Sequence, residues 1–376
     1  MTAPAQGAPG HRILAINPGS TSTKFGVFRD GAPLHAETIR HSREELGRFP
    51  DIPSQRGYRA GLIASALPAR GLSLSEVSAV VGRGGLLRPV AGGVYLVDDA
   101  LCRDLVPGAQ GEHAANLGAL LARDLAEEAS AQAGRPVPAF VVDPVATDEF
   151  APLARYSGLP ELPRRSLCHA LNMKAVGRRF ARSIGRRYDE LDLVIVHLGG
   201  GCSVAAHRHG RIVDSTNGYE DGPFTPERAG ALPASSLVDL AFSGRYPTKE
   251  ALLRRIQREG GLYAYLGTND AQEVEERIEA GDPAAHEVYQ ALAYQTAKEI
   301  GGMAAVLGCQ LDAILLTGGL AHSSLLTGWI EERVGRLAPV FVFPGEDELL
   351  ALAEGAARVL CGEEEPKRYG EEGGRP

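Results

Sequence analysis

A short polar stretch, residues 17–24, carries the side chains best suited to chemistry in the first part of the chain. Its sequence, NPGSTSTK, places a run of hydroxyl groups after Gly19 and ends on Lys24, one of only five lysines among thirty-nine basic residues. Glycine permits a tight turn, and hydroxyl and amide donors at its tip can hold the oxygens of an anion. The stretch therefore suits a phosphate, although a Ser/Thr-rich hairpin with a chance lysine would give the same pattern.

The residues around this stretch indicate how it is positioned. An apolar run at 13–16 precedes it, and alternation resumes through Phe25, Val27 and Phe28. This pattern predicts a strand, a tight hairpin and a second strand.

A second copy of the same pattern occupies residues 193–214, LVIVHLGGGCSVAAHRHGRIVD. The span from Asn17 to Gly31 is fourteen positions and that from His197 to Gly210 is thirteen. Two such hairpins, about 180 residues apart, predict a duplicated fold in which each half offers a phosphate loop to a shared cleft. Chance similarity is the alternative, because glycine is abundant in this chain.

Two arginines stand among turn-forming residues. Arg83 lies within the run Gly-Arg-Gly-Gly at 82–85, after an apolar run, and Arg228 lies within 222–230, which has little regular pattern. The planar guanidinium group matches the oxygens of a carboxylate or a phosphate. A solvated surface arginine and a loop salt bridge are the corresponding structural alternatives.

Two strand ends carry further candidates. Asp143 follows the apolar run 139–142, and open α/β sheets bind ligands beyond the carboxyl ends of their strands. Since Pro144 comes next, Asp143 could instead initiate a turn. Gly318 and Gly319 follow the apolar run at 314–316, where glycine lets the backbone approach a flat ligand.

Apolar residues at helical spacing and helix-end signals predict three helices that carry further candidates. Leu117, Leu120, Leu121 and Leu125 predict a long helix that begins at 111–113, with His113 in its first turn. Residues 164–172 are expected to lead into a second helix, which extends through Tyr188. The final helix is expected to begin at 344–350, with acidic residues in its first turn, as the helix dipole favours.

Three motifs, at 17–24, 197–201 and 317–319, together resemble the acetate and butyrate kinase family of the sugar kinase, heat-shock ATPase and actin superfamily. The form NPGSTSTK is closer to butyrate kinases than to acetate kinases, which typically have Asn-Ala-Gly-Ser-Ser-Ser. The matches run from residue 13 to about 360 in the family's order. The resemblance implies a two-lobed, duplicated, ribonuclease H-like (actin-like ATPase) α/β fold with mixed sheets flanked by helices.

The resemblance also implies roles for individual residues. Catalytic roles fall on Arg83, His113, Asp143, His169 and Arg228, with His169 donating a hydrogen bond to the phosphoryl group in transfer. Nucleotide-binding roles fall on Asn17, Ser20, Ser22, Lys24, His197, Gly199, Gly200, Gly201, Gly318 and Gly319. The cofactors implied are ATP or ADP and Mg²⁺, with Asp143, Glu348 and Glu346 as metal-linked carboxylates; either glutamate fits the family's position.

The sequence departs from the acetate kinase pattern at several places. Gly84 and Gly85 replace bulky apolar residues after the first arginine, Cys168 replaces a phenylalanine before the histidine, and Gly200 replaces an asparagine. We interpret the smaller residues beside Arg83 and His169 as pocket walls that leave room for a longer acyl chain.

The function implied is ATP-dependent phosphorylation of a short-chain carboxylate, butyrate or a branched analogue, to an acyl phosphate, a reaction that also runs in reverse. Alternatives are an acetate or propionate kinase, a sugar or other hydroxyl kinase with Asp143 as base, and an ATP-driven binding module. Family members form dimers or larger assemblies, so a homodimer or higher homo-oligomer is expected. The reaction direction and subunit number stay open.

Length and composition limit the remaining possibilities. The 376 residues suffice for two hydrophobic cores. We expect an N-terminal lobe at 11–165 and a C-terminal lobe at 166–345. The final helix, 346–362, could pack back on the first lobe, and flexible tails are expected at 1–10 and 363–376.

A net charge of −8 argues against a nucleic-acid partner. No apolar run approaches the roughly 20 residues of a membrane span, and the first ten residues do not resemble a signal peptide. The expected location is the cytoplasm. Five scattered cysteines fit neither a disulfide framework nor a CxxC metal site.

Overall fold

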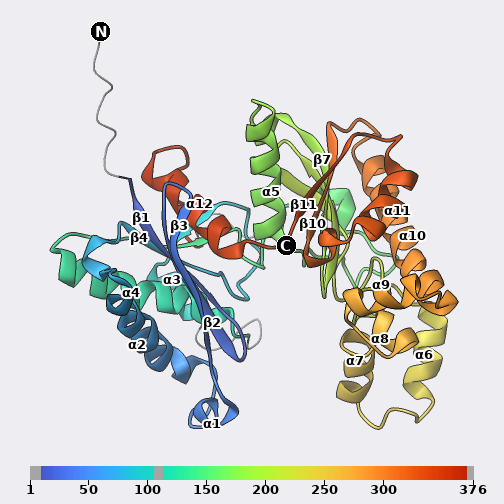
Figure 1. The fold of residues 1–376 in the computed structure, drawn as a ribbon, viewed down its shortest axis with the longest axis horizontal. Helices are drawn as coiled ribbons and strands as arrows, with labels where there is room; N and C mark the ends of the chain where they lie inside the picture. Colours follow the sequence, from blue (N-terminus) through green and yellow to red (C-terminus); the bar gives the residue numbers. More distant parts are fainter. Residues whose placement is uncertain (1–9, 106–112, 371–376) are drawn as a thin grey trace. The chain divides into compact units, whose positions relative to one another are not determined.

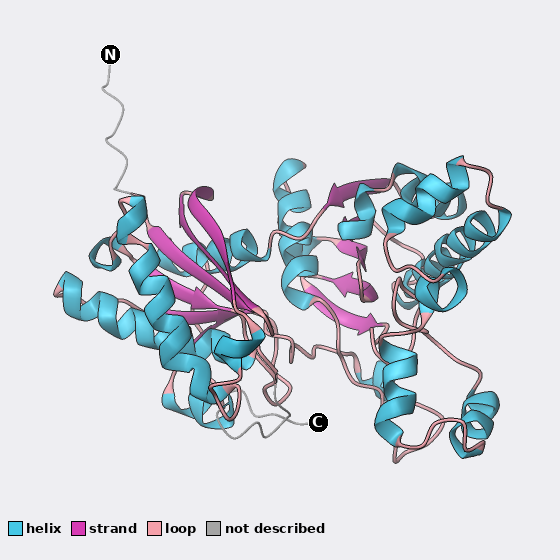
Figure 2. Cartoon of the chain, turned by 60° about the horizontal axis from the view of Figure 1, so that its bottom comes forward, coloured by secondary structure: helices cyan, strands magenta, loops and turns pink. Residues whose placement is uncertain are grey.

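The chain forms two compact units in the computed structural model, which describes residues 10–105 and 113–370. The first unit contains the residues up to Thr147 and those from Asp347 onward, and the second contains Asp148–Glu346. Each unit has a sheet with helices on both sides (Figures 1 and 2).

The sheet of the first unit has six strands in the order β3-β2-β1-β4-β6-β5. The central strands β1, β4 and β6 are parallel, while β1, β2 and β3 form antiparallel pairs and β5 runs antiparallel to β6. The strands are β1 (Arg12–Pro18), β2 (Ser22–Arg29), β3 (Ala32–Arg40), β4 (Ala79–Gly82), β5 (Val94–Leu96) and β6 (Ala139–Val142).

Helices cover both faces of this sheet. On one face, α2 (Arg56–Ala66) and α4 (Asn116–Ala133) bury a cluster that includes Leu14, Ile16 and Leu121. On the other face lies α12 (Glu348–Leu360), drawn in red beside the blue strands in Figure 1, which packs on β1, β4 and β6. The short helices are α1 (Arg43–Leu46) and α3 (Asp99–Leu105).

The sheet of the second unit has the order β11-β10-β7-β8-β9. Strands β7, β10 and β11 are parallel, and β7, β8 and β9 form antiparallel pairs. This order repeats β6-β4-β1-β2-β3 of the first unit, which confirms the duplicated α/β fold with mixed sheets. The strands are β7 (Asp192–Leu198), β8 (Cys202–Arg208), β9 (Arg211–Ser215), β10 (Ala313–Gly318) and β11 (Val340–Pro344).

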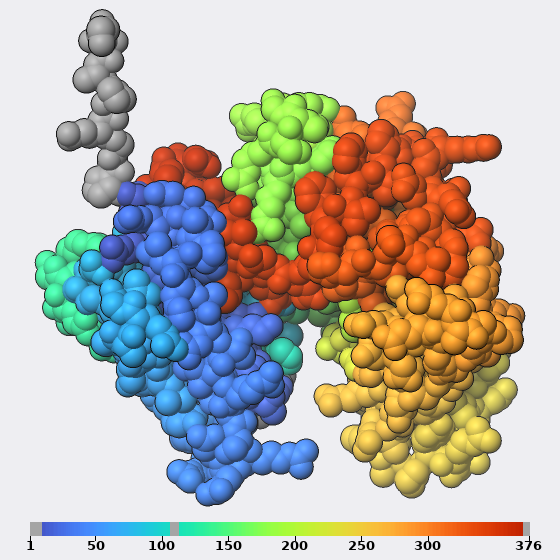
Figure 3. Space-filling model, in the orientation of Figure 1, coloured from blue at the N-terminus to red at the C-terminus, as the bar shows by residue number. Residues whose placement is uncertain are grey.

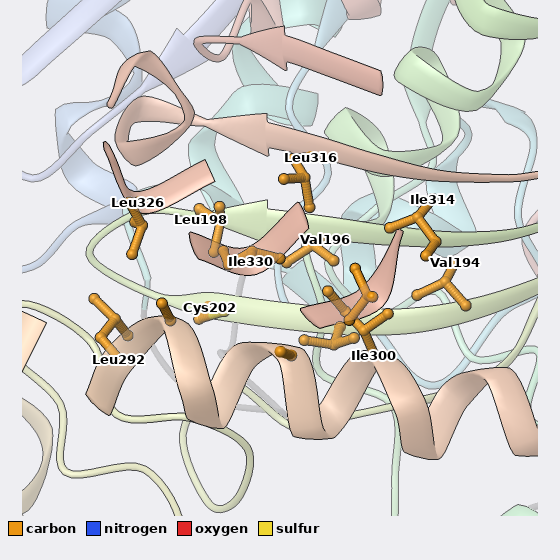
Figure 4. Close-up of a cluster of buried hydrophobic side chains, with 14 of the residues drawn as sticks. Val194, Val196, Leu198, Cys202, Leu292, Ile300, Ile314, Leu316, Leu326 and Ile330 are labelled. Atoms are coloured by element: carbon orange, nitrogen blue, oxygen red, sulfur yellow. The ribbon is translucent and has the colours of Figure 1, made fainter. Parts of the chain in front are cut away.

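Both faces of this second sheet are buried, which explains why β7 reads as a continuous apolar run. One face packs on α10 (Pro283–Val306) and α11 (Ser324–Val334) through Val194, Val196 and Ile314 (Figure 4). The other packs on α5 (Ala170–Ser183). The remaining helices are α6 (Ala234–Phe242), α7 (Lys249–Gln257), α8 (Gly261–Leu266) and α9 (Ala271–Glu279). Helices α6 and α7, yellow in Figure 3, bury none of their residues.

Several expected boundaries differ from those observed. Helix α4 begins at Asn116, so His113 precedes the helix instead of lying in its first turn; residues 111 and 112 lie outside the described residues. Helix α5 ends at Ser183, whereas its end was expected at Tyr188. Gly185, two residues after the observed end, adopts a positive φ. Helix α12 begins at Glu348, because the Asp347 side chain accepts the N–H of Leu350 and caps it.

Two expected domain limits also differ. Residues 148–165 group with the second unit, because Arg164 pairs with Asp214 and the N–H of Ala151 donates to Val213 O. Residues 363–370 are not a loose tail: Lys367 N donates to Val94 O, and Tyr369 is 5% exposed, with its hydroxyl donating to Asp104. The expected tails at 1–9 and 371–376 lie outside the described residues.

No helix within residues 10–105 and 113–370 combines the length and apolar character needed to cross a bilayer.

The cysteines fall into two classes, which gives a first testable prediction. Cys102, Cys168 and Cys202 are buried, whereas Cys309 and Cys361 are exposed. Burial raises the pKa of Cys168 to about 11 and that of Cys202 to about 12, and a thiol reagent attacks only the thiolate. We expect a disulfide reagent to titrate two thiols in the native protein and all five after denaturation. Rapid reaction of a third thiol under native conditions would contradict this burial.

Candidate functional site

Three candidates in the first unit lie at the carboxyl ends of its parallel strands. Asn17 belongs to the end of β1, Arg83 follows β4 and Asp143 follows β6. Because these strands are adjacent and parallel, their ends meet at one edge of the sheet, where α/β folds bind ligands.

A carboxylate from the final helix joins two of these residues. Glu348, in the first turn of α12, pairs with the Arg83 guanidinium and accepts a hydrogen bond from the Asn17 amide. The Arg83 and Glu348 side chains are each 19% exposed. Glu346, the other candidate, lies in the second unit, 3.4 Å from His197 Nε2. The two glutamates that the sequence left as alternatives therefore have different partners.

The backbone at Arg83 is fixed by a close contact between two glycines. A Cβ on Gly82 would lie 1.9 Å from the carbonyl oxygen of Gly118 in α4, and a Cβ on Gly118 would lie 2.2 Å from Arg83 O. The N–H of Leu86 donates to Asn116 Oδ1. Strand β4 and helix α4 therefore hold the segment that carries Arg83.

The small residues interpreted as pocket walls are already in close contact with protein atoms. A Cβ on Gly84 would lie 2.4 Å from Pro144 Cβ, and one on Gly85 would lie 2.5 Å from Asn116 Cα. Cys168 is 6% exposed and belongs to a core cluster with Phe150. These residues serve close packing, so the interpretation that they widen an acyl pocket is wrong.

His113 and Asp143 differ in their access to solvent. His113 is exposed, and its Nδ1 accepts the N–H of Ala115. Desolvation by neighbouring atoms lowers the pKa of His113, and the charge of Arg83 lowers it further. Asp143 is 1% exposed, has a positive φ, and accepts the N–H of Gly93 at Oδ1. Asp143 therefore holds the neighbouring chain segment.

The first hairpin has the predicted form. Asn17 pairs with Lys24 and Pro18 with Thr23, which leaves residues 19–22 between the last paired residues. Ser20 and Lys24 are exposed and Ser22 is half-buried. The predicted phosphate loop is thus a tight turn with its lysine on the adjoining strand.

Two histidines of the second unit, one before α5 and one on β7, stack on each other. The rings of His169 and His197 have centroids 3.8 Å apart and are inclined by 8°. His169 Nδ1 lies 3.0 Å from Ser203 Oγ, and Asn172 Nδ2 donates to His197 Nδ1 at 2.9 Å. His197 Nε2 lies 3.4 Å from the carboxylate of Glu346.

The glycine loop brings Arg228 to these histidines. A Cβ on Gly201 would lie 2.6 Å from Arg228 Nη1 and 3.1 Å from His169 Cε1. Arg228 Nη1 donates to Gly218 O, and the guanidinium lies 4.2 Å from the centroid of the Tyr219 ring. Arg228 Nε is buried and has no hydrogen-bond partner in the described part of the chain. Gly201, His169 and Arg228, which lie far apart in the sequence, therefore converge.

Sequence reasoning missed the residues that support this cluster. Asn172 lies three positions after His169, a spacing that places both on one side of a helix, and Ser203 pairs with His197 in the hairpin. These two positions could have been found from spacing and register. Thr225, whose hydroxyl donates to Gly200 O, and Tyr219 carry no comparable sequence signal.

The turn at Gly318 and Gly319, for which a nucleotide-binding role is expected, adjoins a cavity. Gly318 has φ +93°, and a Cβ there would lie 2.2 Å from Leu198 O, so the turn packs against the end of β7. The cavity beside Gly319 has a volume of about 650 Å³, within the usual range for ligand pockets. It is lined by Asn269, Asp270, Ala271, Gln272, Glu275, Gly319, Leu320, His322 and Ser323.

A larger cavity, of about 840 Å³, lies in the first unit at the opposite ends of the strands. Its lining includes Arg12, Ser78 and Pro138, which precede or begin β1, β4 and β6. None of the predicted site residues lines it.

The residues present fit one mode of Mg²⁺ binding. Within residues 10–105 and 113–370, no group of three or more His, Cys, Asp or Glu side chains is arranged to hold a metal ion. In phosphoryl-transfer sites, however, Mg²⁺ keeps several waters and binds one or two carboxylates together with substrate phosphates. Glu348, at the edge where β1 and β4 end, fits that donor set.

Comparison with known proteins gives a family match over part of the chain and structural matches over nearly all of it. The acetokinase family matches residues 161–334, all within the second unit. The chain is similar to the acetate kinase of Porphyromonas gingivalis (18% identity, TM-score 0.75), with 93% of this chain and 100% of that chain covered. It is also similar to the acetate kinase of Entamoeba histolytica (17%, TM-score 0.70) and a propionate kinase of Francisella tularensis (17%, TM-score 0.68), each covering 92% of this chain and 98% of the other. These similarities establish the shared fold.

Proposed function

We propose that this protein transfers the terminal phosphoryl group of ATP to a short-chain carboxylate, forming an acyl phosphate and ADP, and that the reaction also runs in reverse. The observation that carries the proposal is the convergence of Arg228 and His169 on Gly201. A guanidinium and an imidazole beside a glycine loop suit an anion. The acetokinase match over these residues and the shared fold support the same reading.

The proposed chemistry is a direct in-line transfer. A carboxylate oxygen forms a bond to the γ-phosphorus as the bond from that phosphorus to the β–γ bridging oxygen breaks, and the electron pair leaves with ADP. The carboxylate is already ionised, so no general base is required. The buried position of Asp143 is less suited to the base that a sugar kinase would need.

The main requirement is charge compensation, because an anion must approach a polyphosphate. We assign Arg83 and Arg228 to the carboxylate and the transferring group, with His169 and His113 as hydrogen-bond donors. A substrate carboxylate at Arg83 would replace its pairing with Glu348. Glu348, with Asp143 as a second candidate, would then be available to Mg²⁺, which supplies neutralisation of phosphate charge.

We assign the nucleotide to the two hairpins and the Gly318–Gly319 turn. Asn17, Ser20, Ser22 and Lys24 would bind phosphate oxygens from the first hairpin. The second hairpin would contribute through its glycine loop and His197. The cavity beside Gly319 would take the adenosine.

For the acyl group we propose butyrate or a branched analogue, with acetate and propionate as the alternatives. Support for the longer chain comes from the resemblance of the 17–24 motif to butyrate kinases. In a fitted apolar pocket each missing methylene should cost about 1 kcal/mol. We therefore expect kcat/KM to rise from acetate through propionate to butyrate and isobutyrate, as measured by trapping the acyl phosphate with hydroxylamine.

Two results would redirect this proposal. A preference for acetate of about tenfold would exclude the fitted longer pocket. Transfer to a hydroxyl compound, or ATP hydrolysis that needs no acceptor, would favour a sugar kinase or an ATP-driven binding module instead.

From the same resemblance we propose a cytoplasmic homo-oligomer, a dimer or larger. The exposed apolar side chains of α6, among them Phe242 at 87% and Val238 at 56%, are compatible with a covered surface. Sedimentation equilibrium of the purified chain would give the subunit number, and a monomer at micromolar concentration would contradict the proposal.

A further inference from the structure

A buried arginine lies directly behind the first hairpin. Arg59, on α2, is 1% exposed. Its Nη1 donates to Gly19 O at 2.8 Å, to Ser22 O at 3.0 Å and to Thr23 Oγ1 at 3.0 Å, while Nη2 donates to Ser20 O at 3.2 Å. Nε and Nη2 also donate to Gln55 Oε1. One guanidinium group therefore organises the whole turn.

These bonds orient the backbone of the loop. The carbonyl oxygens of Gly19, Ser20 and Ser22 face Arg59, and Thr21 O accepts the N–H of His41. In the described part of the chain, no protein acceptor is found for the N–H groups of Ser20 and Thr21, and both residues are exposed. Two successive N–H groups without a protein acceptor are available to bind an anion.

The charge of Arg59 is not neutralised by a carboxylate. All of its hydrogen bonds within the described residues go to neutral oxygens. Arg56, one turn earlier on the same helix, is instead paired with Asp124 through two hydrogen bonds. Burying an ion without a counter-ion is costly, and an anion bound at the loop would offset part of that cost.

The loop of the second hairpin is stabilised by different hydrogen bonds. There the Thr225 hydroxyl donates to Gly200 O at 2.8 Å, and the Gly199 N–H donates to Gly201 O. A carboxylate oxygen of Glu227 would lie 3.5 Å from a Cβ on Gly200. The duplicated loops therefore differ: a buried guanidinium donates to the carbonyl oxygens of the first loop, whereas a neutral hydroxyl donates to a carbonyl oxygen of the second.

We propose that Arg59 is a positioning residue that sets the phosphate affinity of the first hairpin, by turning the loop carbonyls inward and by placing an uncompensated positive charge behind the loop. This rests on the proposed function only in the identity of the ligand as the phosphates of a nucleotide. Arg59 touches no substrate in this assignment and acts through the loop.

The test compares Arg59→Met, Arg59→Lys and the control Arg56→Met, which removes a charge from the same helix but leaves the loop untouched. Calorimetry of pyrophosphate binding to the full chain gives phosphate affinity without turnover. We expect Arg59→Met to raise the pyrophosphate Kd and the KM for ATP at least about tenfold, with the KM for the carboxylate within about twofold. Arg59→Lys, which keeps the charge but not the fork, should fall between, and Arg56→Met should bind pyrophosphate like the native chain.

Several outcomes separate this proposal from a purely structural role. If Arg59→Met melts earlier but binds pyrophosphate normally, Arg59 only stabilises the fold and the proposal is wrong. If Arg59→Met does not fold, Arg59→Lys decides, and native affinity in that variant overturns the proposal. If the native chain phosphorylates no carboxylate while pyrophosphate affinity still depends on Arg59, the proposed function fails and this inference stands.

Discussion

Replacing Arg228 or Arg83 by alanine is expected to lower kcat by at least about a hundredfold while ATP binding persists, because an arginine at a transferring phosphoryl group contributes about 10³ to 10⁵ in rate. Arg228 is held by Gly218 O and Tyr219 beside His169, and Arg83 is held beside Glu348. Both guanidinium groups are therefore fixed before substrate arrives. Hydroxylamine trapping would give kcat, and the KM for ATP would report nucleotide binding.

Matched controls are available in each unit. Arg165 pairs with Glu220 and its side chain is 64% exposed, while Arg70 pairs with Glu37 and is 50% exposed. Alanine at either position removes the same charge at an exposed ion pair, which is usually worth less than about 1 kcal/mol. Near-native turnover in Arg83→Ala or Arg228→Ala would remove that arginine from the proposed mechanism.

Gly82→Ala is expected to destabilise the first unit by about 3 kcal/mol, because backbone cannot move aside as a flexible side chain can. The added Cβ would lie 1.9 Å from the carbonyl oxygen of Gly118, so β4 and α4 would have to separate. Arg83, the next residue, would be displaced as well. Urea unfolding monitored by circular dichroism would measure the loss, together with the remaining activity.

Gly61→Ala provides the matching control for this substitution. Gly61 lies within α2, and a Cβ there would meet no other atom within 4 Å. The same change should therefore stabilise the helix by about 0.5 to 1 kcal/mol. Equal unfolding midpoints for Gly82→Ala and the native chain would show that the two glycines are not in the contact described.

The elements that the sequence predicted well are those with strong local patterns. Apolar runs broken by glycine predicted both hairpins and the duplication, because period-two alternation and glycine turns are local signals. The same logic identified Arg83 and Asp143 at strand ends.

The roles that could not be predicted from the sequence depend on contacts between distant segments of the chain. Arg59 sits in an ordinary helical pattern, and only its contacts with the hairpin, about forty positions earlier, distinguish it from other arginines. Gly84 and Gly85 were misread for the same reason, since the residues that fill the space beside them, Pro144 and Asn116, come from other segments. The separation of Glu346 from Glu348 into different units was likewise invisible from spacing.

Helix α12 couples the maturation of the protein to the order of its synthesis. It completes one face of the first unit's sheet and delivers Glu348 to Asn17 and Arg83, yet it is translated after the entire second unit. A nascent chain emerging from the ribosome can finish its later half first, while the earlier half waits with an uncovered apolar sheet. Chaperone demand during translation should therefore concentrate on the segment that was made first.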